Sequence, residues 1–292
     1  MAAQARAQSQ AMAVPRKGRP VPWGTLFTLL ILGIGAVLMI APFLWIISAA
    51  FGKTTEVFVL PPRWLPQNPS DKNFVDVFEQ VPYALFMFNS IKLAVIVTIG
   101  QLITCSMAAY AFARLRFRGK NFLFVLLLSS LMIPGQITIV PLFILVRNMG
   151  LYNTHTALIL PALINPFGVF LLRQYFVTLP TELEDAARVD GASVFTIYWR
   201  IILPLSGPVL TTLAILTFVG MWNSYFFPLI MINTPELQVI TVGLTLLRGQ
   251  YGVGALGPIA AALTMAIVPV LIVFLLLQKY IIRSIVSTGL KA

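Results

Sequence analysis

The sequence predicts an all-α membrane protein with six transmembrane helices, and two observations lead to this fold class. Of the 292 residues, 59% are hydrophobic and only 10% are charged, whereas charged residues make up roughly 25% of an ordinary soluble domain. The charges are also clustered, so six windows of at least 21 residues contain none: 20–52, 93–113, 121–146, 148–172, 201–235 and 249–278. Because a helix needs about 20 mainly apolar residues to cross a bilayer, each window can supply one span. The longest stretch between spans, about 52–88, is too short for a separate enzyme domain of typical size, about 100–150 residues.

The windows place the spans at about 24–51, 90–113, 121–146, 154–176, 205–232 and 258–282, which together make one transmembrane domain over residues 23–283. The first span follows a basic stretch, as a signal peptide does, and Ser48–Ala50 offers small residues for cleavage. Its apolar core is longer than the roughly 7–15 residues of a signal peptide, so we interpret it as a retained span. Because proline interrupts helical hydrogen bonds, kinks are expected in the third and fourth spans at Pro134, Pro141, Pro161 and Pro166.

The segments outside the spans differ in their expected order. Residues 1–22 are rich in Ala and Gln and have no apolar period, which predicts a disordered cytoplasmic N-terminus. The 52–88 stretch carries several prolines and then a short helical pattern, which predicts a small folded cap before a helix start at Asn89–Ser90. The glycine-rich stretch 233–257 predicts an irregular external connection, and residues 284–292 form a short cytoplasmic tail.

The basic residues follow this topology. Fourteen of the 20 lie on the side that holds both chain ends: Arg6, Arg16, Lys17, Arg19, Arg114, Arg116, Arg118, Lys120, Arg173, Arg188, Arg200, Lys279, Arg283 and Lys291. Because cytoplasmic loops carry an excess of Lys and Arg, both termini are expected to be cytoplasmic. A nucleic-acid-binding protein would gather its basic residues in one groove, so the net charge of +11 does not indicate one.

The cytoplasmic connection 177–204 contains the most informative stretch, LPTELEDAARVDGASVFTIYWRIILP. Thr181 and Glu184 have the spacing of a capping box, which predicts a helix start at Thr181. Leu183, Ala186 and Ala187 then share one face of that helix, while Glu184 and Arg188 can form an ion pair on another.

Gly191 is expected to end this first helix. A second amphipathic pattern follows through Val194, Ile197, Tyr198 and Ile201 and ends at Leu203–Pro204. Two short helices joined at a glycine make a compact knob that can enter a groove.

This stretch resembles the conserved loop of permease subunits of ATP-binding-cassette (ABC) importers. The loop pattern is Glu-Ala-Ala, three residues, Gly, nine residues, Ile, one residue and Leu-Pro, and the corresponding residues here are Asp185, Ala186, Ala187, Gly191, Ile201, Leu203 and Pro204. Asp185 stands where the family has Glu; it keeps the charge but shortens its reach by one methylene group. Without the resemblance, the segment would be interpreted as an amphipathic helix pair at the membrane surface.

Three further segments resemble the carbohydrate-uptake branch of these permeases, specifically the six-span maltose-type second permease: NSIKLAVIVTIGQLITCSMAAYAFARLRF, MWNSYFFPLIMI and LLLQKYIIRSIVSTGLKA. The resemblance implies a type I ABC importer permease fold in the inner membrane of a prokaryote. It also implies a heterodimer with a second permease, two cytoplasmic ATPase subunits and an extracytoplasmic solute-binding protein. The chain itself would then be a non-catalytic subunit without a cofactor, because the ATPase subunits bind ATP and Mg²⁺. The solute would be a sugar or a related molecule.

In the resembled family the loop is a coupling helix that sits in a cleft of the ATPase. Carried onto this chain, the coupling role falls to the following residues: Glu184, Asp185, Ala186, Ala187, Asp190, Gly191, Leu203 and Pro204. The tail from Arg283 is expected to add a second ATPase contact.

Polar residues inside the spans are candidates for the solute pathway. Asn223 in MWNSYFF needs a partner inside the membrane, and Trp222 and Tyr225 beside it provide aromatic faces that suit a sugar ring. Packing between helices is the alternative role for Asn223. The same two interpretations apply to Gln136 and Asn165.

Other functions have weaker support. Gly52-Lys53-Thr54 resembles the end of a phosphate-binding loop but has Ile47 where the loop needs a second glycine. No acidic residue lies within a span, which disfavours a proton relay. His155 lacks neighbouring metal ligands in the sequence, and Cys105 is interpreted as a small packing residue. A secondary transporter or channel that acts alone, or an ABC permease for peptides or amino acids, remains the alternative.

Overall fold

The computed structural model describes residues 23–53, 64–251 and 256–289, without the side chains of 250–251 and 280–289. Within these ranges all regular structure is helical. The chain divides into two units, Met1–Ile46 and Ile47–Ala292. The first unit contains most of α2 (Trp23–Phe51), a helix with a mean hydropathy of 2.6 that coincides with the first predicted span.

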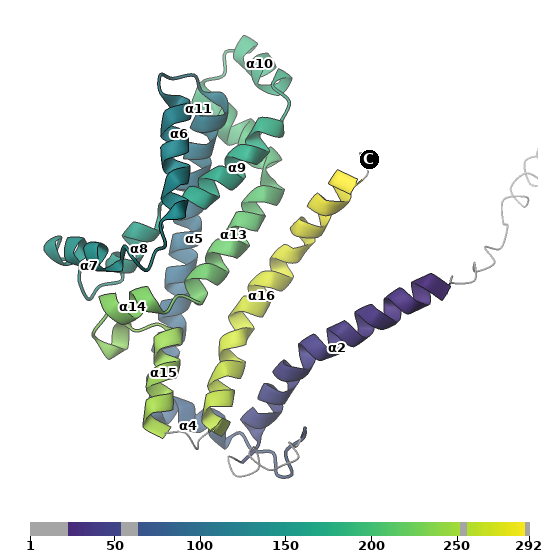
Figure 1. Ribbon diagram of the computed structural model, residues 1–292, viewed down its shortest axis with the longest axis vertical. Helices are drawn as coiled ribbons and strands as arrows, with labels where there is room; N and C mark the ends of the chain where they lie inside the picture. Colours follow the sequence, from purple (N-terminus) through teal and green to yellow (C-terminus); the bar gives the residue numbers. More distant parts are fainter. Residues whose placement is uncertain (1–22, 54–63, 252–255, 290–292) are drawn as a thin grey trace, which may run out of the picture. The chain divides into compact units, whose positions relative to one another are not determined.

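The second unit is built around the long helix α5 (Tyr83–Arg114), which packs against α9 (Pro166–Thr178) and α13 (Gly207–Trp222). Helix α16 (Leu256–Gly289) lies along α13, and its Ala262 carbonyl accepts a 2.6 Å hydrogen bond from the Tyr83 hydroxyl at the start of α5. In Figure 1, α10 (Glu182–Val189) and α11 (Val194–Ile197) lie at one end of this unit. At the opposite end lie α4 (Lys72–Gln80) and α15 (Ile240–Tyr251).

Among the described residues, two clusters of buried side chains hold the second unit together. One lies where α5 and α9 meet the segment 197–213, and it comprises Cys105, Ala109, Tyr110, Val169, Leu172, Phe176, Ile197, Tyr198, Ile202, Val209 and Leu213. The other joins α5 to the shorter helices and comprises Leu93, Val146, Ala157, Leu158, Met231, Ile232, Val239 and Val242. Cys105 is buried in the first cluster, in keeping with a packing role.

The predicted count of six spans is not confirmed. Four helical stretches of the described chain are long and apolar enough to cross a membrane: Trp23–Phe51, Tyr83–Arg114, Thr156–Thr178 and Leu256–Lys279. A fifth would be the bent pair Val194–Leu205 and Gly207–Trp222, whose axes differ by 78°. The predicted third span instead forms α6 (Lys120–Ser129) with η1 (Ser130–Met132), and then α7 (Ile139–Asn148) after a break that contains Pro134.

The predicted fourth and fifth spans are also interrupted. The fourth forms α8 (Thr156–Ala162) and α9, separated by residues 163–165 directly before Pro166. The fifth forms α13 and α14 (Phe226–Met231), separated by residues 223–225. An unbroken apolar window shows only that a segment can enter lipid, and it does not show that the segment is one straight helix.

Two predictions about helix positions were wrong. Helix α5 begins at Tyr83 and not at Asn89–Ser90. The Asn89 amide donates to the carbonyls of Glu236 (2.8 Å) and Gln238 (3.0 Å), and the Ser90 hydroxyl accepts from the Ile240 amide (2.8 Å), so both side chains bind another segment and cap no helix. The stretch 233–257 is not wholly irregular, because it contains α15. Helix α16 continues to Gly289, beyond residue 282 where the predicted span ends. A helix can extend past the membrane, so the span end stays a prediction.

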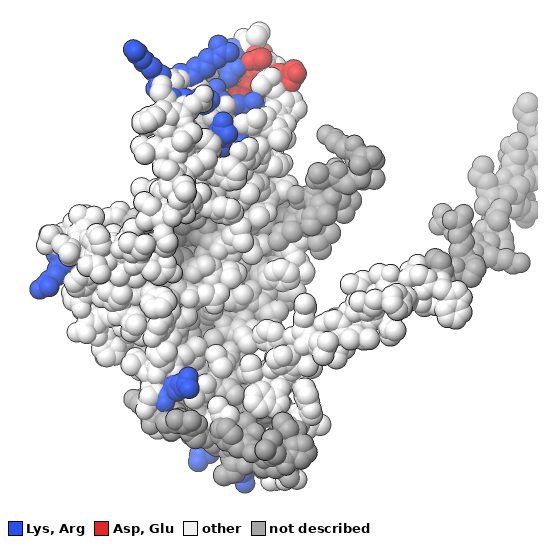
Figure 2. Space-filling model, viewed as in Figure 1, with Lys and Arg blue, Asp and Glu red and all other residues white. Residues whose placement is uncertain are grey.

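The remaining connections are consistent with the sequence where they are described. A short helix, α4, follows the proline-rich stretch as predicted. Residues 1–22 and 290–292 lie outside the described residues, as does Thr54 of the Gly52-Lys53-Thr54 stretch. Figure 2 shows acidic and basic side chains gathered at the end of the second unit that carries α10, while the orientation of this end in a membrane stays a prediction.

Candidate functional site

The predicted coupling segment forms α10, and its first turn differs from the expected capping box. Thr181 is the N-cap residue, as predicted, but its side chain makes no capping hydrogen bond. The Glu184 carboxylate faces inward instead, with Oε1 2.8 Å from Nε of Arg114 and Oε2 3.1 Å from a nitrogen of Arg188. Two guanidinium groups stabilise a carboxylate more than one uncharged backbone amide does. This explains why the Glu184 side chain pairs with Arg114 and Arg188 and does not take part in a capping box.

The outer surface of α10 is apolar and acidic. Leu183, Ala186 and Val189 are exposed, and Val189 is 88% exposed. Asp185 is also on the surface, where its carboxylate forms a 2.6 Å ion pair with Arg188. Ala187 is half-buried against the first core cluster, so the face predicted for Leu183, Ala186 and Ala187 is divided between solvent and core.

Gly191 ends α10 as predicted, through a Schellman motif. Its φ of +80° is a left-handed conformation that side chains other than glycine disfavour. The Gly191 amide donates to the Arg188 carbonyl (3.0 Å), and the Ala192 amide donates to the Ala187 carbonyl (2.9 Å). Asp190 occupies the C-cap position. No heavy atom would lie within 4 Å of an added Cβ at Gly191, so the requirement for glycine comes from the backbone alone.

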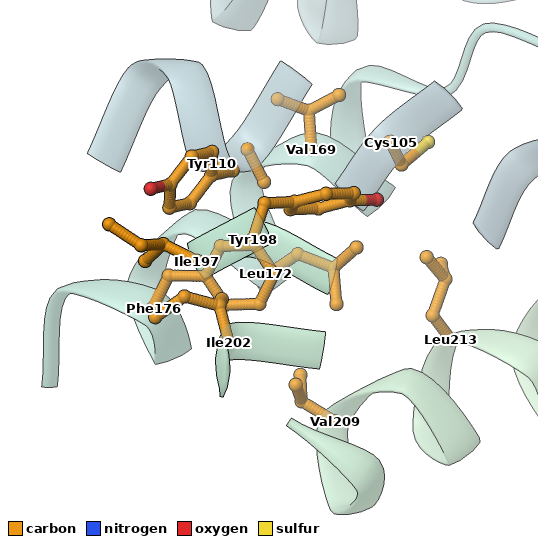
Figure 3. Close-up of a cluster of buried hydrophobic side chains, with 11 residues drawn as sticks. Cys105, Tyr110, Val169, Leu172, Phe176, Ile197, Tyr198, Ile202, Val209 and Leu213 are labelled. Carbon is orange, nitrogen blue, oxygen red and sulfur yellow. The ribbon is translucent and has the colours of Figure 1, made fainter. Parts of the chain in front are cut away.

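The second half of the knob enters the core. Ser193 caps α11 by accepting a 3.2 Å hydrogen bond from the Thr196 amide. The chain continues as a π-helical turn, η2 (Tyr198–Ile202), and then as α12 (Leu203–Leu205). Ile197, Tyr198 and Ile202 point among the side chains of the first core cluster (Figure 3). Of the predicted pattern, Ile197 and Tyr198 are buried and Ile201 packs against this cluster, whereas Val194 is exposed and Ile202 was not predicted.

Polar and proline residues end the knob. The Tyr198 hydroxyl lies 2.7 Å from the Ser106 hydroxyl of α5. Leu203 and Pro204 stand just before the 78° bend that leads into α13. Pro204 is exposed there, and the hydroxyl of the buried Ser206 at the bend donates to the Ile202 carbonyl (2.7 Å). This knob, residues 181–204, is therefore joined to α5 by buried contacts: the packing of the first core cluster and the Tyr198–Ser106 hydroxyl pair.

Asn165, one of the predicted pathway residues, caps α9. Its Oδ1 accepts from the Gly168 amide (3.1 Å), and its Nδ2 donates to Oε1 of Gln101 (2.9 Å). These bonds occupy the side-chain amide with helix capping and interhelical packing. The packing interpretation therefore describes the geometry of Asn165.

Gln101 is a buried polar residue that the sequence analysis missed. Its Oε1 accepts from Asn165 and from the Thr217 hydroxyl of α13 (2.8 Å), and its Nε2 donates to the Ala162 carbonyl (2.6 Å). In a continuous helix this carbonyl would accept from the amide of residue 166, but Pro166 has no N–H. Gln101 supplies the missing donor.

Two neighbours of Gln101 on α5 also contact carbonyl groups at this break. The Thr104 hydroxyl donates to the Leu163 carbonyl, and the Cys105 thiol lies 3.5 Å from the Asn165 carbonyl oxygen. Residues 101, 104 and 105 share one face of a helix. This spacing, opposite two prolines in the predicted fourth span, is the sequence signal that could have revealed the network.

The other predicted pathway residues do not form one cluster. Trp222 is buried and stacks on Phe218, with ring centroids 6.0 Å apart and an interplanar angle of 11°. Asn223 is exposed in the break after α13, and half-buried Tyr225 contacts Phe226 edge-on. Gln136 is exposed in the break between η1 and α7. A role for Asn223 or Gln136 in a pathway stays a prediction.

A cavity of about 330 Å³ brings the three helix breaks together. Its lining includes a residue from each break or its edge, namely Thr138, Ala162 and Ser224, and is completed by Leu142, Ala157, Leu158, Pro161, Met221, Phe227 and Pro228. The lining is mainly apolar. In a membrane protein, broken helices are tolerated where the backbone is buried in protein or lines a cavity, and the cavity lining supplies the second condition here.

His155 lies between α8 and the loop before α15. Its Nε2 is 2.9 Å from the Leu237 carbonyl oxygen, and burial lowers the pKa of the half-buried imidazole. The nearby Lys92 ammonium also lowers this pKa, while the bond to Leu237 opposes both effects. In the described part of the chain, no group of three or more His, Cys, Asp or Glu residues is arranged to hold a metal ion.

Comparison with known proteins identifies the chain at the level of family. Residues 101–287 match the family model described as the inner membrane component of binding-protein-dependent transport systems. The chain is 38% identical over 256 residues to the probable ABC transporter permease protein YurM of Bacillus subtilis, with 86% of this chain and 83% of the relative covered. It is 36% identical over 285 residues to the arabinooligosaccharides transport system permease protein AraQ of Halalkalibacterium halodurans, with 94% and 99% covered.

A solved structure has the same fold. It is a chain of a bacterial ABC transporter involved in the import of the acidic polysaccharide alginate, with a TM-score of 0.79 and 24% sequence identity. The match covers 91% of this chain and 99% of that chain. At this identity the likeness establishes the fold alone.

Proposed function

The chain belongs to the binding-protein-dependent transport system inner membrane component family, and we propose that it forms, with a second permease, the translocation pathway of a sugar importer. As an ABC transporter permease it is a non-catalytic membrane subunit. In the proposal, two ATPase subunits bind ATP and Mg²⁺ and drive transport, and an extracytoplasmic solute-binding protein delivers the solute. Both termini of this chain are cytoplasmic.

The knob carries this proposal. Its exposed side chains, Leu183, Ala186 and Val189, form an apolar surface next to the acidic Asp185. An apolar, close-packing helix surface with a charge at its edge suits a groove in a protein partner. Its inner side is fixed to α5 by the Arg114–Glu184 ion pair, so a force applied to α10 reaches the membrane helices directly.

The solute class rests on the relatives and not on the cavity. A relative that is 36% identical is named for arabinooligosaccharides, which supports a sugar or an oligosaccharide as the solute. The cavity at the three breaks is mainly apolar and offers few hydrogen-bond partners to hydroxyl groups. We therefore propose that this chain lines the translocation pathway and changes its shape during transport. Asn223 and Gln136 are its candidate polar contacts to the solute.

Purification through an affinity tag on this chain, from its native membrane, tests the proposal. A second permease and an ATPase should copurify, and a cysteine at the exposed position 186 (Ala186→Cys) should crosslink to the ATPase. A cysteine introduced at position 118 (Arg118→Cys), which is exposed on the connection between α5 and α6, serves as the control for crosslinking by proximity alone.

Proteoliposomes then identify the transport activity. The purified complex with its binding protein should accumulate a labelled arabinooligosaccharide only when ATP is supplied on the side of α10. Solute uptake by this chain alone would refute the proposal and indicate a secondary transporter or channel. Uptake of peptides or amino acids by the complex would retain the importer and change its solute class.

A further inference from the structure

Glu184 is the one charged residue in the buried set of the described side chains. Its side chain is 1% exposed, and the side chain of its partner Arg114 is 9% exposed. The guanidinium of Arg114 makes two contacts: Nε lies 2.8 Å from the Glu184 carboxylate, and a terminal nitrogen donates to the Leu179 carbonyl. Arg114 therefore contacts α10 and also the chain that leads into it.

A buried ion pair is an expensive way to join two helices. Both charges must leave water, and apolar side chains of similar volume often hold such a site at least as firmly. An arginine has a different advantage, because its guanidinium can contact two groups at once. Here it holds the Glu184 carboxylate at ion-pair distance, without an aligned Nε–H hydrogen bond, and it donates a hydrogen bond to the Leu179 carbonyl. The pair thus suits a site where α10 must keep one orientation relative to α5 while a load acts on it.

The ion pairs of Arg188 on the outside of α10 cannot fix the orientation of α10 relative to α5. Arg188 joins Glu184 and Asp185, but all three residues belong to α10, so this pairing stiffens the helix without linking it to another. The Asp185 side chain is 65% exposed, and solvent screens an exposed pair. Arg114, the last residue of α5, makes the link between elements.

Helix α5 leads from this link to the cavity. Gln101 lies 13 positions before Arg114, which is roughly 20 Å along an α-helix. At that position it holds the Ala162 carbonyl at the break between α8 and α9, and Ala162 lines the cavity. One continuous helix therefore connects the underside of the knob with the lining of the cavity.

We propose that Arg114 and Glu184 are a positioning pair that makes α5 and α10 move as one lever, so that displacement of α10 moves the α8–α9 break beside the cavity. This inference rests on the proposed function, in which α10 is the element that docks on the ATPase. Neither residue touches the solute or ATP. Their loss separates ATP hydrolysis from transport without removing either partner from the complex.

The test uses the complete complex in proteoliposomes and measures solute molecules moved per ATP hydrolysed. Arg114→Met and Glu184→Gln should each lower this ratio at least about fivefold, at the low end of typical coupling between sites. Arg114→Lys keeps the charge but cannot make both contacts at once, so it should recover only part of the ratio. Arg118→Met, which removes an exposed charge from the same connection, should match the wild type.

The double variant Arg114→Met/Glu184→Leu separates positioning from simple stability. It replaces both charges with apolar side chains, so the complex should assemble even if a single variant does not. A low transport-to-ATP ratio in an assembled double variant supports the lever. A normal ratio in that variant, or in the single variants, overturns the lever and makes the pair structural.

Failure of the proposed function gives a different result. If the wild-type chain neither copurifies with an ATPase nor crosslinks through position 186, then the docking role of α10 is wrong before any variant is compared. If the wild type assembles and transports while Arg114→Met transports equally well per ATP, then only the lever is wrong.

Discussion

Replacing Gln101 by Leu should destabilise the fold at the break between α8 and α9. The variant keeps a similar volume but removes three hydrogen bonds, to the Ala162 carbonyl, the Asn165 amide and the Thr217 hydroxyl. Each net hydrogen bond between membrane helices contributes about 0.6 kcal/mol on average. A buried polar group left without a partner costs about 1–3 kcal/mol. The Ala162 carbonyl is left without a donor, because Pro166 has no N–H, and this costs about 1–3 kcal/mol. The lost bonds to Asn165 and Thr217 add about 1.2 kcal/mol, so we expect a total loss of about 2–4 kcal/mol.

The assay is unfolding of the purified chain in mixed micelles titrated with SDS, followed by helical circular dichroism. Gln136→Leu is the matched control, since it removes the same amide from an exposed position and should change stability by less than about 0.5 kcal/mol. The double variant Gln101→Leu/Asn165→Leu should lose less than the sum of the single losses, because the two side chains share a hydrogen bond. A Gln101→Leu variant as stable as the control would show that Gln101 does not hold this break.

Three further changes test other parts of the molecule. Gly191→Val should reduce copurification of the ATPase or its coupling to transport, because a left-handed conformation costs an L-residue about 1–2 kcal/mol; Gly191→Asn should do so less, and equal yields and uptake for all three chains would contradict this. Asn223→Leu should slow uptake while the complex still assembles, and unchanged uptake kinetics would favour the packing role. At His155 the folded-state pKa is lowered, so the unfolded chain binds more protons and stability should fall as pH drops below the ordinary value of 6.5; the same unfolding assay should show this loss in the wild type and not in His155→Gln.

The sequence predicted helix-forming segments well and their continuity poorly. Hydropathy located both ends of α2 to within one residue and the start of α16 to within two, because each is one long apolar helix. It failed at 121–146, where another charge-free apolar window forms α6, η1 and α7. Pro134 and Pro141 predicted a disturbance there, but a proline can either bend a helix or end it. Which of these occurs depends on whether a neighbouring side chain satisfies the carbonyls that the proline leaves free.

Local patterns predicted the knob better than the pathway. The end of α10 at Gly191 and the inward direction of Ile197 follow from residues close in the chain, so the sequence indicated both. The partner of Glu184 is distant in sequence, since Arg114 lies 70 positions earlier. A capping box was the best local use of Glu184, but it was wrong because a charged partner came from another helix. Trp222 and Asn223 are adjacent in the chain, yet one is buried and the other exposed.

The same reasoning explains why the informative polar residues of this chain lie on α5. A membrane helix with broken neighbours must supply hydrogen-bond donors at the height of the breaks, because lipid offers none. Helix α5 supplies Gln101 and Thr104 at the break between α8 and α9, and it supplies Arg114 at the knob. These polar residues sit on an otherwise apolar helix, so hydropathy alone gives them no weight. Each of them binds a group in another segment: Gln101 and Thr104 bind carbonyls at the break between α8 and α9, and Arg114 pairs with Glu184. In the proposed lever, a displacement of α10 therefore reaches the cavity through α5, although α10 and the cavity do not touch.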